Sequence, residues 1–228
     1  MVYARTLGSQ SYTFQVSGML WRNSLIMRDR ETGSLWSHVT GEGLSGPAKS
    51  KRLERWTSVQ TTWTKWRAAH PDTRVLKKSE EVLSSHYQKY FDDPERNGLF
   101  RSQWLMEKMP GKTKVHGAVV GAHAVAITDG AFGPDGLVSV DLGGTTAVVV
   151  LSSDGGVRAF EARVGDRKLE IEHAAGAFRD AATGSAWDLE RGTATAGPMT
   201  GEALEPVPVT TVFWFAWSSF YPNTQVIE

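Results

Sequence analysis

Several side chains with acid–base or charge chemistry lie between residues 29 and 72. An imidazole can exchange a proton near neutral pH or bind a metal ion, and neighbouring charges tune its pKa. We therefore take His38 as the candidate acid/base or metal ligand, with Arg30 and Glu31 as its charge partners and His70 as a further catalytic candidate. The predicted ligand-binding set consists of Asp29, Arg30, Glu31, His38, Glu42 and Asp72.

These residues stand out because the stretch around them occurs twice. Adding 151 to each residue number from Arg28 to Leu76 gives Arg179 to Ile227 without a gap, and 16 of the 49 paired positions are identical. Chance would give only a few identities. The identical pairs include three tryptophans: Trp36/Trp187, Trp63/Trp214 and Trp66/Trp217.

The positions that differ between the two copies point to function. Residues kept in both copies, such as Asp29 and Trp36, are explained by a shared fold. Six polar positions are not kept: Arg30, Glu31, His38, Glu42, His70 and Asp72 correspond to Ala181, Ala182, Leu189, Thr193, Tyr221 and Asn223. Because the second copy manages without this set, we expect any ligand or chemistry to belong to the first copy or to the cleft between the copies.

Composition limits the classes of partner. The chain has 228 residues, 40% hydrophobic and 22% charged, with a formal net charge of +0. Balanced charge predicts no nucleic-acid partner and no anionic membrane surface. No run approaches the roughly 20 apolar residues of a transmembrane helix. The absence of cysteine excludes disulfides, thiolate metal ligands and a cysteine nucleophile within this sequence.

Two short helices are predicted around the tryptophan pairs. Thr61 and Thr62 can cap a helix that carries Trp63 and Trp66 on one face and ends before Pro71. The second copy repeats the pattern around Trp214 and Trp217, after Thr210–Thr211. We expect each tryptophan pair to dock its helix on a sheet. A further helix is expected at Ser79–Tyr90.

The remaining patterns favour strands. Alternation predicts a hairpin between Val2–Arg5 and Ser11–Val16, turning at Gly8-Ser9. Val115 to Gly156 is strand-rich, with strands expected at Leu137–Val140 and Thr145–Leu151. This segment has no counterpart in the first copy. We therefore expect the chain to be truncated at its N-terminus relative to a longer protein.

The fold class that follows is mainly β, a β-rich α+β fold. It consists of two duplicated lobes of antiparallel strands with short Trp-bearing helices, related by a pseudo-twofold. The first lobe is 1–76 and is N-terminally incomplete, an ordered crossover with a helix covers 77–114, and the second lobe is 115–228.

Established catalytic motifs are absent: the sequence has no G-x-S-x-G, H-E-x-x-H, P-loop or EF-hand pattern. The histidines outside the first copy, His116, His123 and His173, lie in strand patterns at unrelated spacing. Each is interpreted as a structural residue.

Longer motifs resemble a known family. They are Val16-Ser17-Gly18, Asn23 to Met27, Asp29 to Ser37, Gly41-Glu42, Trp63, Trp66, His70 to Thr73 and Tyr221 to Thr224. Over nearly the whole chain the sequence resembles the family catalogued as domain of unknown function 3179. The resemblance implies an extracytoplasmic location, and a Cys-Pro-x-x-Cys-like motif upstream of the strand at Val2–Arg5, which this sequence lacks.

Three functions remain open. The leading interpretation is a ligand- or partner-binding module, for a small molecule or a protein, with its site in the first lobe or the inter-lobe cleft. The first alternative is a metal- or redox-dependent protein that combines upstream cysteines, and a metal in the full-length form, with polar groups of the first lobe. The second is a structural or interaction domain. A deep cleft without convergent ionisable groups would favour the binding module.

Overall fold

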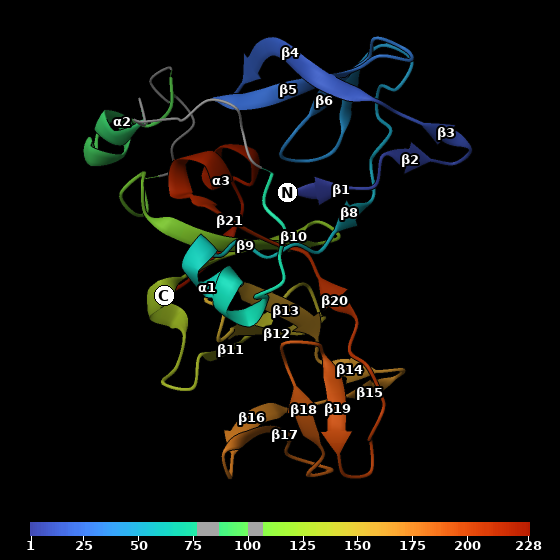
Figure 1. The fold of residues 1–228 in the computed structure, drawn as a ribbon, viewed down its shortest axis with the longest axis vertical. Coiled ribbons are helices and arrows are strands. Elements are labelled where there is room, and N and C mark those ends of the chain that lie inside the picture. Colours follow the sequence, from blue (N-terminus) through green and yellow to red (C-terminus); the bar gives the residue numbers. More distant parts are fainter. Residues whose placement is uncertain (77–86, 100–106) are drawn as a thin grey trace.

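The computed structural model describes residues 1–76, 87–99 and 107–228 (Figure 1). The protein is mainly β, as predicted, with 42% of residues in strands and 10% in helices. The described strands form several small sheets rather than one large one, and their pairing is antiparallel except between β10 and β22. The fold-class prediction is therefore confirmed at the level of secondary structure.

The helices in the described residues are short. They are α1 (Trp63–Ala69), α2 (Gln88–Asp92), α3 (Trp214–Phe220) and one 3-10 turn, η1 (Asp129–Ala131). In the described part of the chain, no helix is long and apolar enough to cross a membrane.

The first region, residues 1–76, is built from local strand pairs. Its strands are β1 (Val2–Tyr3), β2 (Thr6–Leu7), β3 (Gln10–Ser11), β4 (Phe14–Trp21), β5 (Ser24–Asp29), β6 (Leu35–Ser37), β7 (Gly43–Ser45) and β8 (Arg55–Trp56). β4 to β7 form a four-stranded sheet in chain order, β2 pairs with β3, and β1 pairs with β8. The first region therefore forms one meander and two short ladders.

The predicted hairpin between Val2–Arg5 and Ser11–Val16 is wrong. β1 pairs with β8, more than fifty residues away, and β4 pairs with β5. The turn at Arg22-Asn23 explains the second pairing, because both residues have positive φ, the geometry of a tight two-residue hairpin turn. Gly8, at φ +60, does turn the chain as expected, between β2 and β3.

The second region, residues 114–228, begins one residue before the predicted lobe boundary. Its strands are β9 (Lys114–Val120), β10 (His123–Thr128), β11 (Leu137–Asp141), β12 (Thr146–Leu151), β13 (Val157–Glu161), β14 (Arg163–Val164), β15 (Arg167–Lys168), β16 (Ile171–Ala174), β17 (Ala177–Asp180), β18 (Ala186–Asp188), β19 (Thr193–Ala196), β20 (Pro206–Val207), β21 (Val209–Phe213) and β22 (Gln225–Ile227). They form the sheets β21-β9-β10-β22, β11-β12-β13-β20, β14-β15 and β16-β17-β18-β19. The strands expected at Leu137–Val140 and Thr145–Leu151 are confirmed as β11 and β12.

Elements of the two regions correspond in order. β4-β5-β6-β7 matches β16-β17-β18-β19, β2-β3 matches β14-β15, and β1-β8 matches β13-β20. The register agrees as well. Trp56 and Val207, which are 151 residues apart, pair with Val2 and Ala159, so the strands before the repeated stretch correspond with an offset of 157 residues. Within the described residues, β9 to β12 have no counterpart in the first region. Superposition of the regions about a pseudo-twofold stays a prediction.

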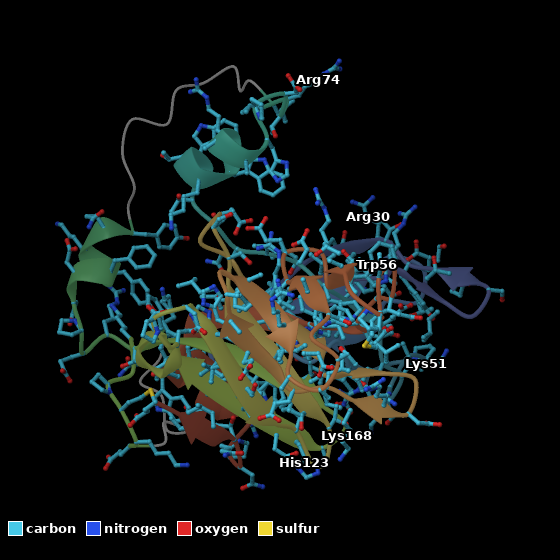
Figure 2. The ribbon with its side chains drawn as sticks, turned by 90° about the horizontal axis from the view of Figure 1, so that it is seen from below. Arg30, Lys51, Trp56, Arg74, His123 and Lys168 are labelled. Carbon is cyan, nitrogen blue, oxygen red and sulfur yellow. The ribbon has the colours of Figure 1, made fainter. Side chains whose placement is uncertain are left out.

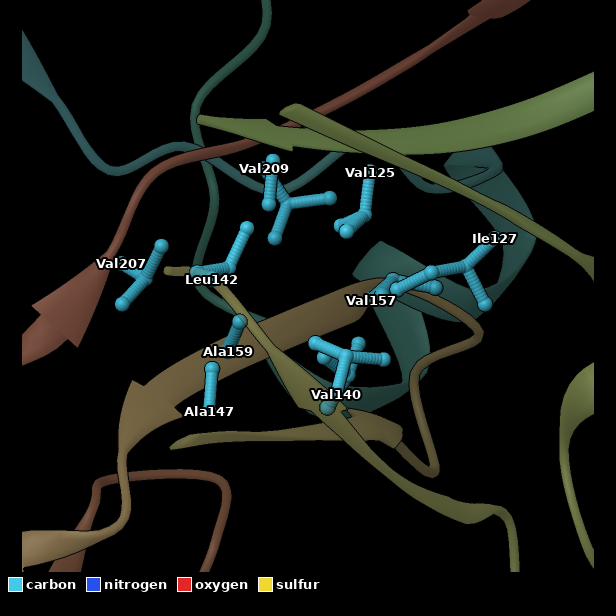
Figure 3. Packing of buried hydrophobic residues seen from close by; sticks show 11 residues of the cluster. Val125, Ile127, Val140, Leu142, Ala147, Val157, Ala159, Val207 and Val209 are labelled. Carbon is cyan, nitrogen blue, oxygen red and sulfur yellow. The ribbon is translucent and has the colours of Figure 1, made fainter. Parts of the chain in front are cut away.

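One of the two main cores lies in the second region, between its two central sheets (Figure 3). It includes Ile127, Leu142, Val149, Val157 and Val209. Burying a side chain of this size contributes about 1.5–3 kcal/mol, so this cluster anchors the central sheets. Because Val209 belongs to the core, it also fixes the edge strand β21, whose next residues face a groove described below.

The tryptophan-bearing helices have different surroundings. Trp214 and Trp217 are buried, packed with Val115 and Ala126, so α3 docks on its sheet as predicted. The same prediction is wrong for α1, where Trp63 is 51% exposed and no residue is buried. The physical reason is that no described strand covers that face of α1.

The helix caps also differ. Thr62 caps α1 as predicted, because its side chain accepts a hydrogen bond from the Lys65 amide. The N-cap of α3 is Phe213, which makes no side-chain cap bond. The capping role expected of Thr210–Thr211 is wrong, because both residues lie inside β21.

The segment between the regions contains α2. Residues 79–86 of the helix predicted at Ser79–Tyr90 lie outside the described residues, and the described helix runs from Gln88 to Asp92. Lys112 holds this segment to β9, because its ammonium group donates to the Tyr90 carbonyl and lies 4.0 Å from the Tyr90 ring centroid. That 77–114 acts as an ordered crossover stays a prediction.

Candidate functional site

Asp29, one of the predicted ligand-binding residues, is fully buried at the end of β5. Its carboxylate accepts hydrogen bonds from the Thr32 amide at 2.6 Å and from Trp36 Nε1 at 2.7 Å. Burial alone would raise the pKa of Asp29, but these hydrogen bonds outweigh it and leave the pKa below its ordinary value. Hydrogen-bond donors of the protein itself use this carboxylate, and these bonds fix the turn beneath Trp36.

Arg30 and Glu31 lie on the exposed side of the same turn. Glu31 Oε2 accepts a hydrogen bond from the Thr13 amide at 2.8 Å, and Arg30 Nε donates to Gln15 Oε1 at 3.3 Å. The hydrogen bond from Thr13 keeps the pKa of Glu31 below its ordinary value. Both side chains therefore form hydrogen bonds with β4 or with Thr13, the residue just before it, rather than with His38.

The second region shows what Glu31 contributes. Glu170 occupies the place of Thr13, and its amide donates to Asp180 Oδ1 at 3.1 Å, where Ala182 replaces Glu31. Trp187, the counterpart of Trp36, has no partner for its indole nitrogen among the described residues. The two regions thus use different carboxylates to accept the hydrogen bond of this amide, which belongs to Thr13 in the first region and to Glu170 in the second. Only in the first region does the aspartate also accept a hydrogen bond from the tryptophan.

His38 lies half-buried after β6. Among the described residues its side chain makes no hydrogen bond or ion pair. Burial, and then the positive charge of the N-terminal amine, lower the pKa of His38, so the imidazole is neutral at pH 7. His38 is therefore placed as a neutral polar group, without the charge partners predicted for it.

The other predicted residues lie elsewhere. Glu42 forms an exposed ion pair with Arg52 at 3.3 Å, and Asp72 is exposed in the turn after α1. His70 ends α1, where its ring stacks on Trp66 with centroids 4.1 Å apart. In Figure 2, Arg74 and α1 project away from the body of the protein, whereas Arg30 lies on the body itself. The predicted set does not converge, and the described residues contain no group of three metal-binding side chains.

A groove of about 750 Å³ lies between the two regions, lined by described residues of both. One wall is β21, which contributes Val209 to Val212, and the opposite wall is 58–62 with Trp63 and Trp66. Met1, Val2, His38 and Val157 complete the lining. Of the predicted site residues, only His38 lines this groove.

The groove has few ionisable groups. His38 is its one titratable side chain among the described lining residues, and the Met1 amine, whose pKa is lowered by burial, is the other ionisable group. The wall at His38 is fixed by Tyr3, whose hydroxyl donates to the Val39 carbonyl at 2.8 Å. Burial raises the pKa of Tyr3 to about 12, so this hydroxyl keeps its proton.

One hydrogen-bonded network behind the groove was missed by sequence reasoning. Thr211, on the groove wall, lies 2.9 Å from His116 Nδ1, and His116 Nε2 lies 2.8 Å from Asp129 Oδ1. Lys114 pairs with the same carboxylate at 2.7 Å. Burial lowers the pKa of His116 despite Asp129. A neutral imidazole that donates to Asp129 therefore accepts from the Thr211 hydroxyl.

The missed signal was a pairing between distant strands. Thr211 and His116 are directly opposite each other on β21 and β9. Sequence spacing cannot show this, because the two residues are far apart in the chain. The interpretation of His116 as a structural histidine stays a prediction, and the structure adds that its ring shares a hydrogen bond with a hydroxyl in the groove.

Comparison with known proteins identifies a family without a known activity. No curated protein and no solved structure matches the chain. The family model described as "Protein of unknown function (DUF3179)" matches residues 1–224. Since this match spans nearly all of the 228 residues, the chain belongs to that family.

Proposed function

We propose that the chain is a binding module whose groove holds an uncharged ligand between β21 and residues 58–62. The observation that supports this proposal is the lining of the groove. It consists of hydroxyl, apolar and aromatic side chains, and His38 is the one titratable side chain among the described lining residues. Sites of this kind use apolar walls for affinity and a few polar groups for orientation.

The polar groups of the groove are positioned before any ligand binds. Arg55 donates to the Thr210 hydroxyl, and His116 engages that of Thr211. Trp66 is held by a hydrogen bond from its Nε1 to Thr73 at 2.9 Å. Groups fixed in this way lose little entropy when a ligand binds, which favours affinity.

An NMR titration with small probe molecules tests the proposal. Neutral probes (N-acetyl amino-acid amides, methyl glycosides and phenol) should shift the signals of Val59, Thr210 and Thr211, whereas acetate and phosphate should not. Replacing His38 by leucine, the residue at the corresponding position 189, should weaken the neutral probes and leave folding intact.

The matched control is His123→Leu, which removes an exposed histidine that does not line the groove. It should leave probe binding unchanged. If anions bind the groove as well as neutral probes do, or if the two leucine variants behave alike, the proposal is wrong.

A hydrolytic activity is a second candidate, favoured by the order Thr211, His116 and Asp129. A hydroxyl next to a neutral imidazole that is itself oriented by a carboxylate can act as a nucleophile. Hydrolysis of p-nitrophenyl acetate tests this candidate. Thr211→Val should abolish the hydrolysis that the control His123→Leu retains, and equal rates in both variants would rule the candidate out.

The metal- or redox-dependent alternative stays open, because it requires cysteines that this sequence does not contain. Metal binding by a longer form of the protein would favour it over the binding module, provided that His38→Leu reduced the metal content. The structural or interaction alternative predicts that no probe binds the groove.

A further inference from the structure

α1 and α3 are the same local structure. Both span seven residues, and their C-caps have nearly equal angles, φ −132 and ψ 71 at His70 against φ −124 and ψ 68 at Tyr221. Trp66 bonds to Thr73 at 2.9 Å, and Trp217 bonds to Thr224 at 3.0 Å. A difference in helix conformation therefore does not explain their different burial.

The hairpin β9–β10 covers α3. Trp214 is 0% exposed and Trp217 is 2% exposed, and both pack with Val115 and Ala126 of this hairpin. The closest approach is at Gly117, where an added Cβ would lie 2.2 Å from the Trp217 ring. Only glycine fits between this strand and the helix.

The segments flanking α3 also bind this hairpin. β21, just before the helix, pairs antiparallel with β9, and β22, just after it, pairs parallel with β10. Helix, preceding strand and following strand thus form one seat for a two-stranded hairpin.

The counterpart seat around α1 has no covering hairpin among the described residues, although the Thr61 hydroxyl donates to the Asp154 carbonyl. Residues 58–62 and 74–76 correspond to β21 and β22, but neither pairs with a strand among the described residues. Trp63, Val75 and Leu76 are exposed there, at 51%, 66% and 88%. Large apolar side chains gathered next to unpaired backbone are typical of an interaction surface.

We infer that α1, residues 58–62 and residues 74–76 form a docking site for a β-hairpin of a partner protein. This site shares residues 58–62, Trp63 and Trp66 with the groove, but it does not rest on the groove binding a small ligand. The first strand of that hairpin pairs antiparallel with 58–62, and its second strand pairs parallel with 74–76. A glycine in its first strand faces Trp66, as Gly117 faces Trp217. Strand addition of this kind draws affinity from backbone hydrogen bonds and specificity from side-chain fit.

The charges around the seat indicate which charges the partner hairpin carries. Arg67 and Arg74 are exposed on and after α1, whereas α3 carries no charged residue. A partner hairpin with acidic residues on its flanks would complement these cations and associate faster at low salt.

The probe for this inference is a cyclic peptide of residues 113–129 of this chain, closed by an Asn-Gly turn so that the hairpin is formed in advance. Circular dichroism of the peptide establishes that it is a hairpin. Calorimetry and hydrogen exchange are then measured on the whole protein. We expect saturable binding and slower exchange at residues 58–62 and 74–76.

Three variants make the test specific. A peptide with Gly117→Val should bind at least tenfold more weakly, because the added side chain meets Trp66. Val75→Pro in the protein should cause a similar loss, because proline removes a ladder N–H group. Trp56→Ala removes another exposed tryptophan, on β8, and should change nothing.

Three results would overturn the inference. One is the absence of binding by the folded peptide at millimolar concentration. Another is equal binding by the Gly117→Val peptide. The third is dimerisation of the protein alone that Trp63→Ala abolishes, since a second copy would then occupy the surface.

Discussion

The helices α1 and α3 have the same tryptophan–threonine hydrogen bond and the same C-cap conformation, but they differ in the segments that pack against them. α3 is buried under β9–β10, whereas α1 is exposed, although three of the identities in the repeated stretch, at Trp63, Trp66 and Thr73, maintain the same helix in both regions. The comparison separates local structure from tertiary packing: seven residues and a cap are enough to define the helix, and a neighbouring hairpin decides whether its tryptophans contribute to stability.

The turns at Asp29 and Asp180 differ in a subtler way. Both bury an aspartate that accepts from a threonine hydroxyl, at 2.8 Å from Thr32 and 2.7 Å from Thr183. Only Asp29 also holds the adjacent tryptophan. The same turn therefore supports two different hydrogen-bond arrangements, and the pairs of substitutions below measure the difference.

The largest expected effect concerns the helices. Trp214→Ala should lower the free energy of unfolding by about 3–5 kcal/mol, the cost of emptying a buried aromatic site. Trp63→Ala should change it by no more than about 0.5 kcal/mol, as for an exposed side chain. Urea unfolding of both variants measures the contrast. Equal losses would mean that α1 is packed as α3 is.

The next contrast is between the tryptophans of the two turns. Trp36→Phe leaves a buried carboxylate without one donor, which costs about 1–3 kcal/mol beyond the change in volume. Trp187→Phe removes an indole N–H group that has no partner among the described residues, so it should cost less by that amount. Similar losses in the two variants would show that the Asp29–Trp36 hydrogen bond contributes nothing to stability.

A pH dependence follows from the same carboxylates. Hydrogen bonds outweigh burial and lower the pKa of both Asp29 and Asp180 in the folded protein. Their stabilising contribution is present at neutral pH. It is lost as the pH falls below the ordinary aspartate value of about 4, because the unfolded chain then takes up protons first. Asn at either position should flatten the slope of stability against pH between about 4 and the folded pKa.

A slope that persists in both Asn variants would assign acid sensitivity to other carboxylates. The comparison then moves to Asp154, whose pKa is lowered chiefly by its hydrogen bond from Arg158 at 2.7 Å. Asp154→Asn would be the corresponding variant in the second region.

Sequence reasoning succeeded where local rules decide the outcome. Pro71 and Thr62 set the ends of α1, and the strand-rich, β-branched sequence placed β11 and β12 within one residue. These features depend on a few neighbouring residues, whose effects a sequence shows directly.

The failures concern contacts between distant residues. β1 pairs with β8 rather than in a hairpin, Trp63 lacks the sheet that covers Trp214, and His38 lies apart from Arg30 and Glu31. Comparing the two copies drew attention to Glu31 because position 182 is alanine. The comparison could not show that Asp180 accepts the amide hydrogen bond in the second region that Glu31 accepts in the first, because this depends on which amide each carboxylate reaches.

The smallest expected effect tests that exchange. Glu31→Ala should speed hydrogen exchange at the Thr13 amide, because this side chain accepts its hydrogen bond at 2.8 Å. The Glu170 amide is the control within the same molecule, since Asp180 holds it at 3.1 Å and the substitution does not touch it. Glu31 is exposed, so global unfolding should hardly change. NMR exchange rates of the two amides decide the matter. An unchanged rate at Thr13 would leave Glu31 free to act as the charge partner that the sequence first predicted, whereas a faster rate at Thr13 alone would show that Glu31 maintains the fold of the first region.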